Sequence, residues 1–193
     1  MSNTEANSNA LLVIISAPSG GGKTTIAHEL ISRFPGSKRC ITSTTRPARS
    51  TEIPDQDYHF ISDEKFDEIL SQDGFAEWAT VHNYRYGTPK QQIKDALDNK
   101  QMLFLTVDVQ GAESFKKLYA EKTLSVFVSP PDFDILETRL RKRGTEEDGE
   151  IRRRLENARK EIAKANEFDY QVLNDRLERA VLEIESIIKK RIA

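Results

Sequence analysis

Cysteine and histidine are scarce in this sequence, and long hydrophobic runs are missing. The single cysteine, Cys40, cannot form a disulfide within the chain, and the three histidines have no metal-ligand spacing. No apolar stretch approaches the roughly 20 residues that a membrane-spanning helix needs, and no signal-peptide pattern opens the chain. These features argue against a disulfide-rich secreted domain, a structural metal site and a membrane partner, and they predict a cytoplasmic protein.

A dominant charge of either sign is also lacking. Lysine and arginine number 29 against 31 acidic residues, which leaves a formal net charge of -2. A strong positive field is what draws a protein to nucleic acid or to an anionic membrane. We therefore expect no nucleic-acid partner, and we predict that any basic binding site is local. No obligate protein partner is evident from the sequence.

The length and the hydrophobic pattern indicate an α/β fold. The 193 residues suffice for one domain with an inserted subdomain. Short apolar runs alternate with helical patterns, which is typical of a parallel sheet covered by helices on both faces. The predicted core strands are 11–15, 102–107, 123–128 and 170–173. The predicted core helices are 23–34, 110–119, 132–143, 150–167 and 177–191.

The pattern changes between residues 39 and 99, which we interpret as a lobe inserted into a core of residues 11–38 and 100–189. Shorter elements are predicted here, namely strands at 39–42, 58–61 and 75–81 and a helix at 63–72. Another helix is predicted just after Thr88, which can cap it, with Pro89 at the first helical position and Gln91 completing a capping box. Residues 1–10 are polar and are expected to fray.

A candidate phosphate-binding loop, Ala-Pro-Ser-Gly-Gly-Gly-Lys-Thr, joins the first predicted strand to the first predicted helix. Its glycines let backbone N–H groups turn inward around phosphate oxygens, Lys23 can reach the β- and γ-phosphates of ATP, and the Thr24 hydroxyl can ligate Mg²⁺. The general motif has glycine where this chain has Ala17, so this alanine must keep a negative φ. The alternative is a chance glycine-rich turn. The predicted ATP-binding residues are Ser16, Ala17, Pro18, Ser19, Gly20, Gly21, Gly22, Lys23, Thr24 and Thr25.

A second candidate site lies in the inserted lobe. Arg46 and Arg49 stand three residues apart among hydroxyl side chains, and Pro47 keeps this loop extended. Guanidinium forks match phosphate oxygens bidentately, although a solvated basic loop is the alternative. Farther along, Glu77 on an apolar strand needs a partner or a water-filled cavity. It can instead pair with an arginine or lie exposed beside Trp78.

Together these segments resemble the guanylate kinase family. The resemblance rests on the phosphate loop followed by Ser-Thr-Thr-Arg-x-x-Arg, Asp-Tyr, Phe-x-Glu-Trp-Ala, Tyr-Gly-Thr and Asp-x-Gln-Gly, in this order, and it covers residues 11–189. It implies a P-loop NTPase-type core, a GMP-binding lobe and a lid. It also implies an enzyme of purine nucleotide metabolism that transfers the γ-phosphoryl group of ATP, with Mg²⁺, to GMP or dGMP.

The resemblance implies a role for each matching residue. The residues implied to bind the GMP phosphate are Arg46, Arg49, Tyr58 and Tyr86. The residues implied to lie around the guanine are Thr42, Glu77, Thr88 and Asp108. A carboxylate suits the N1–H and N2–H₂ donors of guanine, whereas adenine would present an acceptor to it. A site built on such hydrogen bonds can reject an analogue that lacks them by roughly 10⁴-fold.

Two of the implied assignments have alternatives. Asp108 would contact the guanine amino group or orient Mg²⁺-bound water, but it can also simply cap the end of a strand. The family often has a second acid where this chain has Thr106, which argues against a magnesium site with two carboxylates. Asn174 matches a position near the adenine of ATP, and a turn asparagine is the alternative.

Residues 139–154 form an acidic, Gly-bounded loop with basic residues at both ends, which we interpret as a hinged lid. Arginines that arrive on closure suit phosphoryl transfer, because the protein mainly positions the reactants and stabilises charge. A pair of solvated charged helices is the alternative. The resemblance implies that Arg143 and Arg154 are the lid arginines that meet the phosphates, so the predicted catalytic residues are Lys23, Arg46, Arg143 and Arg154.

Other functions stay open at this stage. A kinase acting on another phosphorylated acceptor, such as a ribose phosphate, needs no base-reading carboxylate, so Glu77 counts against it. A guanylate-kinase-like module that binds phosphorylated peptides without catalysis would be favoured by loss of the phosphate loop, which is intact here. A GTPase or a nucleic-acid ATPase would leave the inserted lobe without a purpose.

Replacing Lys23 tests the phosphate loop. We expect Lys23→Ala to abolish phosphoryl transfer, because the ammonium group would no longer neutralise the phosphates of ATP. GMP binding should stay measurable, because the acceptor residues lie in the inserted lobe. An assay for ADP release and a calorimetric GMP titration measure the two effects. Wild-type turnover in this variant would refute the assignment of the loop.

Overall fold

A five-stranded parallel sheet, ordered β2-β7-β1-β8-β9, forms the core of the folded protein. The structure is a computed structural model that describes residues 10–50, 52–81, 83–142 and 148–193. The strands of this sheet are β1 (Leu11–Ser16), β2 (Lys38–Arg39), β7 (Met102–Thr106), β8 (Thr123–Ser129) and β9 (Tyr170–Leu173). All six residues of β1 are buried, as its uninterrupted apolar sequence requires of a strand covered on both faces.

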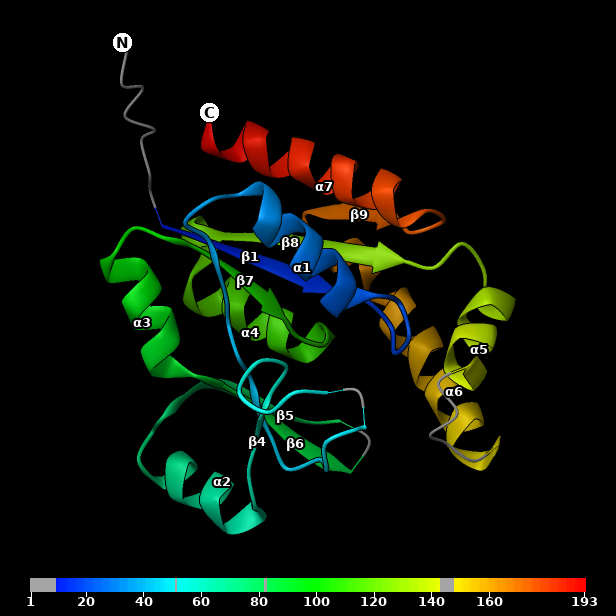
Figure 1. Ribbon diagram of the computed structural model, residues 1–193, viewed down its shortest axis with the longest axis horizontal. Coiled ribbons are helices and arrows are strands. Elements are labelled where there is room, and N and C mark those ends of the chain that lie inside the picture. The colour runs from blue at the N-terminus through cyan, green and yellow to red at the C-terminus, as the bar shows by residue number, and fades with distance from the viewer. Residues whose placement is uncertain (1–9, 51, 82, 143–147) are drawn as a thin grey trace.

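Helices cover both faces of this sheet (Figure 1). Val13 and Ile15 of β1 pack in one core cluster with α1 (Lys23–Arg33) and α7 (Leu177–Ile192). Leu12 and Ile14 point the opposite way, into a second cluster with α3 (Lys90–Asp98) and α4 (Val109–Leu118). None of the helices in the described part of the chain is both long and apolar enough to cross a bilayer.

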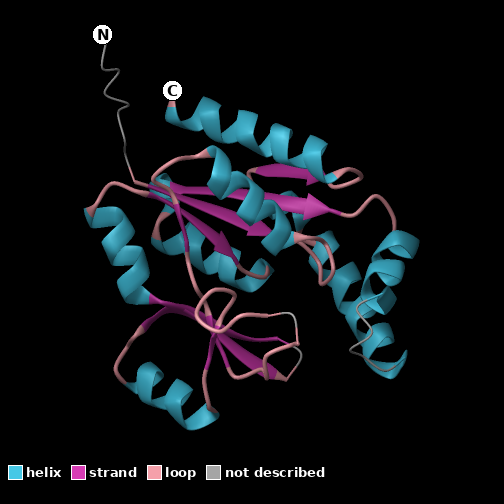
Figure 2. Cartoon of the chain, viewed as in Figure 1, coloured by secondary structure: helices cyan, strands magenta, loops and turns pink. Residues whose placement is uncertain are grey.

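A second, smaller sheet lies below the core in the same view (Figure 2). Its strands are ordered β4-β3-β6-β5 and comprise β3 (Ser43–Thr44), β4 (His59–Phe60), β5 (Phe75–Val81) and β6 (Tyr84–Pro89). Helix α2 (Asp63–Ser71) begins after Ser62, whose hydroxyl accepts from the backbone N–H of Lys65. Its buried Phe66 packs on Phe75, with 4.5 Å between ring centroids. This contact fastens the helix to the smaller sheet.

Two helices, α5 (Phe133–Lys142) and α6 (Asp148–Ala163), pack against each other beside the core. Short 3₁₀ turns also occur at Ala120–Lys122 and Ala165–Glu167. The helix predicted at 150–167 therefore ends earlier than expected, and the turn separates it from β9. Predicted residue Arg143 and residues 1–9 of the expected tail lie outside the described residues.

The strand predicted at 39–42 is wrong except for Arg39, which ends β2, because residues 40–42 connect β2 of the core sheet to β3 of the smaller sheet. Arg39 pairs with Phe104 in the core sheet, whereas Ser43 pairs with Gly87 in the smaller sheet. The chain thus passes from one sheet to the other over a few residues. A single apolar and hydroxyl-rich run does not reveal that its two ends have different partners.

The capping box predicted at Thr88 is wrong. Thr88 lies in β6 opposite Glu77, and β6 continues to Pro89, which pairs with Phe75. Helix α3 begins after Pro89 without a side-chain cap, and the Gln91 side chain donates to another residue of that helix. Pairing with β5 therefore outweighs the local helix-start signal.

Gly87 offers a test of how closely the smaller sheet is packed. An added Cβ there would lie 2.7 Å from the Phe75 ring, so we expect Gly87→Ala to lower the free energy of unfolding by ~1–3 kcal/mol. Denaturant unfolding measures the change. Gly149→Ala is the control, because an added Cβ there meets nothing within 4 Å and alanine favours a helix. Equal stability of the two variants would contradict the expectation.

Candidate active site

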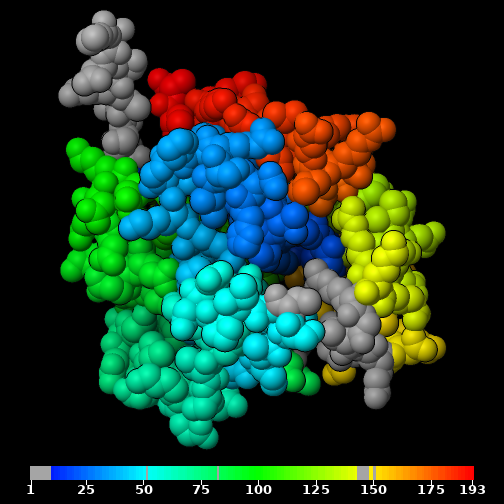
Figure 3. Space-filling model, in the orientation of Figure 1, coloured from blue at the N-terminus to red at the C-terminus, as the bar shows by residue number. Residues whose placement is uncertain are grey.

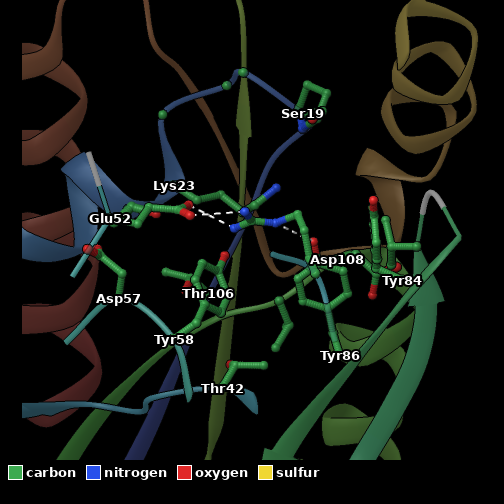
Figure 4. Close-up of a pocket in the computed structure, with 18 of the residues that line it drawn as sticks. Ser19, Lys23, Thr42, Glu52, Asp57, Tyr58, Tyr84, Tyr86, Thr106 and Asp108 are labelled. Carbon is green, nitrogen blue, oxygen red and sulfur yellow. Dashed lines mark hydrogen bonds and ion pairs between the residues drawn. The ribbon is translucent and has the colours of Figure 1, made fainter. Parts of the chain in front are cut away.

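A cavity of about 560 Å³ opens between the core, the smaller sheet and the α5–α6 pair (Figure 3). Its walls come from the loop after β1, from the inserted lobe, from the end of β7 and from α6. In Figure 4, Ser19 and Lys23 lie on one side of the cavity, and Thr42, Tyr58 and Tyr86 lie on the other. The cavity is at the carboxyl ends of β1 and β7, where open α/β sheets bind their ligands.

The loop between β1 and α1 has the backbone geometry of an anion cradle. Gly20 and Gly22 have φ of 86° and 96°, a region that favours glycine. Gly21 is needed for a different reason, since an added Cβ would lie 2.7 Å from the Ala17 methyl group. Ala17 is not among the described non-glycine residues with positive φ, so its replacement of the motif glycine causes no backbone strain. Helix α1 starts without a side-chain cap, which leaves its N-terminal end available to an anion.

Three side chains hold this loop in place. The Lys23 ammonium group donates to the backbone carbonyl of Ala17. Arg154 of α6 donates from Nη1 to the Ser19 hydroxyl at 3.1 Å, and Asn174, after β9, donates from Nδ2 to the carbonyl of Gly21 at 3.0 Å. Asn174 is buried, and its hydrogen bond to Gly21 supports the loop. Its contact with adenine stays a prediction.

Helix α5 lies directly on the loop. The side chains of Leu136 and Leu140 pack so close to Gly20 that an added Cβ there would lie 3.2 Å from each of them. Both leucines are buried. Movement of α5 would therefore change the packing of the phosphate loop.

The Arg46 side chain is held by several hydrogen bonds on the lobe side of the cavity. Its Nε donates to the Tyr86 hydroxyl at 3.2 Å, and its Nη1 and Nη2 donate to the two carboxylate oxygens of Glu52 at 3.0 and 2.8 Å. Arg49 donates its backbone N–H to the same carboxylate at 2.8 Å. The Arg46 guanidinium lies 5.5 Å from the ring centroid of Tyr58. These contacts bring two arginines and two tyrosines together on one wall of the cavity.

Glu52 is ionised in this arrangement. Burial tends to raise the pKa of its carboxyl, but hydrogen bonds from Arg46 and from the Arg49 backbone outweigh burial and lower this pKa. Removing Glu52 would leave the buried Arg46 guanidinium without its charge partner, which is strongly destabilising.

Glu77 has the opposite electrostatic character. Burial, helped by the negative field of Asp108, raises the pKa of its carboxyl to about 7, although a hydrogen bond from Thr88 acts to lower it. The Thr88 hydroxyl donates to Glu77 Oε1 at 2.5 Å. A buried carboxylate with a single hydroxyl donor can accept further hydrogen bonds from a ligand.

Asp108 both caps a helix and lines the cavity. Its Oδ1 accepts from the backbone N–H of Gly111 at 2.9 Å, which caps α4, and its Oδ2 accepts from the Gln110 side chain at 3.1 Å. The capping alternative and a role at the ligand site are therefore compatible. Thr106, two residues earlier, also lines the cavity.

Most of the predicted site residues line this one cavity. Those on its wall are Pro18, Ser19, Gly20, Gly21, Gly22, Lys23, Thr24, Thr25, Thr42, Arg46, Arg49, Tyr58, Glu77, Tyr86, Asp108 and Arg154. Four more are buried and adjoin residues of the wall, since Ser16 and Ala17 directly precede Pro18, Thr88 donates to Glu77 and Asn174 donates to Gly21. The structure thus brings together residues from every segment that the sequence singled out, Arg143 excepted.

A family model for guanylate kinase matches residues 9–191. The chain belongs to the guanylate kinase family. It is 43% identical over 180 residues to a guanylate kinase of Anaeromyxobacter dehalogenans, covering 93% of this chain and 80% of that protein. The identity to a guanylate kinase of Syntrophotalea carbinolica is also 43%, covering 93% and 85%.

A solved structure agrees with the sequence relatives. The crystal structure of guanylate kinase from Anaplasma phagocytophilum superposes with a TM-score of 0.80 at 27% identity, covering 94% of this chain and 85% of that one. The predicted α/β fold of P-loop NTPase type is confirmed, and so is the enzyme class, a nucleoside monophosphate kinase.

Several polar residues of the cavity, Glu52, Asp57, Tyr84 and Glu161 among them, were not predicted as site residues. Glu52 follows Arg49 by three residues, a spacing that allows a turn to bring them together. Glu161 follows Arg154 by seven residues, which places both on one face of a helix. Tyr84 precedes Tyr86 by two residues on the same strand face. Asp57 also lines the cavity, and no periodicity pointed to it.

We expect Glu77→Gln to stabilise the protein at pH 8. Folding raises the pKa of Glu77 from 4.5 to about 7, so its ionised form opposes folding. This cost is absent well below pH 4.5, grows as the pH rises, and is complete above about pH 7. At ~1.4 kcal/mol per pKa unit, the gain at pH 8 is at most ~3 kcal/mol.

Chemical unfolding at pH 5 and at pH 8 measures this effect. The difference between Glu77→Gln and the wild type should shrink at pH 5. Glu183→Gln, at an exposed position of α7, is the control. Its stability difference from the wild type should be about the same at both pH values. The expectation is contradicted if the Glu77→Gln difference is the same at both pH values.

Proposed function

We propose that this enzyme transfers the γ-phosphoryl group of ATP to GMP, and to dGMP, and forms GDP or dGDP together with ADP. The observation that carries the proposal is the placement of the Glu77 carboxylate and the Arg46 fork in the same cavity as the phosphate loop. One wall thus suits a guanine and a fixed phosphate, and the other suits a polyphosphate.

Glu77 is the proposed base-reading group. Its carboxylate accepts from N1–H and N2–H₂ of guanine, while the Thr88 hydroxyl orients it through Oε1. Thr42 is buried and lines the same cavity, and its proposed partner is the base's O6. Adenine would present the lone pair of N1 to the carboxylate, so the site disfavours AMP.

Arg46 and Arg49 are the proposed acceptor-phosphate ligands, with the hydroxyls of Tyr58 and Tyr86. Glu52 and Tyr86 already hold Arg46 in one orientation, so less side-chain freedom is lost when the phosphate binds. An oxygen of the ionised GMP phosphate attacks the γ-phosphorus directly. A bond forms to that oxygen while the bond to the β-phosphate oxygen breaks, and ADP leaves without a covalent enzyme intermediate.

The donor side of the transfer uses the phosphate loop, Lys23 and arginines of the lid. Lys23 leaves the Ala17 carbonyl to meet the β- and γ-phosphates, and Arg154 already reaches the loop through Ser19. We propose the same catalytic part for Arg143. Closure of the lid excludes water, which would otherwise accept the phosphoryl group.

The residues of the cavity fit Mg²⁺. They offer hard oxygen ligands, namely the Thr24 hydroxyl, the Asp108 carboxylate and a buried Glu161 oxygen that has no hydrogen-bond partner within the described residues. The described ranges contain no cluster of three or more metal-binding side chains, and Mg²⁺ in kinases is typically held by one or two carboxylates and by substrate phosphates. When bound, the ion neutralises charge on the β- and γ-phosphates.

The boundaries of the core, the lobe and the lid given from the sequence stay part of this proposal. Cytoplasmic location and the lack of an obligate partner also stay predictions.

An acceptor panel tests the proposed function. ADP release is measured with GMP, dGMP, AMP, CMP, UMP and ribose phosphates in turn, and we expect release with GMP and dGMP only. Glu77→Gln should lower the preference for GMP over AMP by more than tenfold, because an amide cannot accept from both guanine donors.

Each other outcome of the panel has a definite meaning. ADP release with ribose phosphates would support a kinase that acts on those acceptors. No ADP release with any nucleotide would support a module that binds phosphorylated peptides without catalysis. Unchanged selectivity in Glu77→Gln would remove Glu77 from base recognition.

A further inference from the structure

Glu161 places a carboxyl group at the phosphate loop. It lies near the C-terminal end of α6, lines the cavity and interacts with the backbone N–H of Ser19. Its Oε2 atom is buried and has no hydrogen-bond partner within the ranges that the structure describes. A carboxylate oxygen in such a position normally has a partner, because leaving it bare is costly.

The surroundings of Glu161 carry charges of both signs. The field of Lys23 acts in favour of the ionised carboxylate, and that of Asp108 acts against it. Burial is the largest influence and raises the pKa of Glu161. The nucleotide-free protein therefore does not fully compensate this charge.

ATP makes the position of Glu161 harder to explain without a cation. The β- and γ-phosphates would lie in a loop that has Glu161 and Asp108 in the same cavity, and like charges at short range repel strongly where water is scarce. Lys23 and Arg154 supply one positive charge each at the loop, and the phosphates of ATP carry more negative charge than these two neutralise. A divalent cation between the carboxylates and the phosphates removes the repulsion and gives the bare oxygen a partner.

We propose that Glu161 contributes, together with Asp108 and the Thr24 hydroxyl, to binding the Mg²⁺ that accompanies ATP. The inference rests on the proposed function only in that ATP is the donor. Because Glu161 and Arg154 lie on the same face of α6, the ion also draws this helix toward the phosphate loop. Glu161 thus links metal binding to the lid.

Calorimetric titration of ATP, without GMP, tests the inference with no need for turnover. Each protein is titrated once with excess Mg²⁺ and once with EDTA. In Glu161→Gln we expect the affinity for MgATP to fall about tenfold, the size typical of groups that support a bound metal. The affinity for metal-free ATP should rise, because the variant no longer repels the phosphates.

Two further variants and one further measurement serve as controls. Glu156→Gln changes an exposed glutamate of the same helix, paired with Lys160, and should keep both affinities. Glu161→Asp keeps the negative charge and should keep most of the effect of Mg²⁺. The GMP affinity of Glu161→Gln should equal that of the wild type, which shows that the lobe is folded.

Weaker binding of MgATP together with tighter binding of metal-free ATP in Glu161→Gln distinguishes metal binding from the other roles that Glu161 could have. Weaker binding of both MgATP and metal-free ATP would show that Glu161 only supports the loop, and tighter binding of both would show that it only repels phosphate. Either result, or no change, overturns the inference. ADP release by the wild type tests the proposed function separately, so the two can fail independently.

Discussion

Repulsion between two phosphate groups is the constraint on which the arrangement of this protein depends. Donor and acceptor phosphates must meet in one cavity although the chain as a whole is slightly acidic. Positive charge is therefore gathered locally, from the start of α1 and Lys23, from Arg46 and Arg49 in the lobe, and from Arg154 on α6. No single segment carries all of it, which is why three parts of the chain have to converge.

Local positive charge creates its own difficulty in the absence of substrate. Arg46 is buried, and a buried guanidinium needs a partner at all times. Glu52 provides one, and through the same contact it orients Arg46 and Arg49 toward the cavity. Glu161 has a comparable position on the donor side, but one of its oxygens lacks a partner within the described structure. Before nucleotides bind, both carboxylate oxygens of Glu52 thus have hydrogen-bond donors, whereas Oε2 of Glu161 has none within the described residues.

Glu77 shows that the site is built at a cost in stability. Its raised pKa means that the folded protein holds the carboxylate in an environment that favours the neutral acid. A residue chosen for stability alone would not be acidic there. The hydroxyl of Thr88 offsets part of the cost and leaves acceptor capacity for a ligand. Recognition of a base with two neighbouring donors gives a physical reason for the arrangement.

The sequence by itself determined the features that depend on neighbours along the chain. The glycines of the phosphate loop, the apolar run of β1 and the order of the motifs are local, so pattern and spacing were enough to predict the fold class and most of the residues on the cavity wall. Gly20 and Gly22 illustrate this, since the positive φ of each is a property of one residue and its turn.

Only the tertiary structure decided which distant residues meet. Ser19 and Arg154 are 135 residues apart in the chain, and their contact exists because α6 packs beside the loop. Long-range packing likewise decides that residues 40–42 connect two sheets, that Thr88 pairs with Glu77 and that Glu161 lies at the cavity. Backbone pairing across strands is worth more than a local capping signal, so the sequence around Thr88 pointed to a helix cap where the folded chain has a strand.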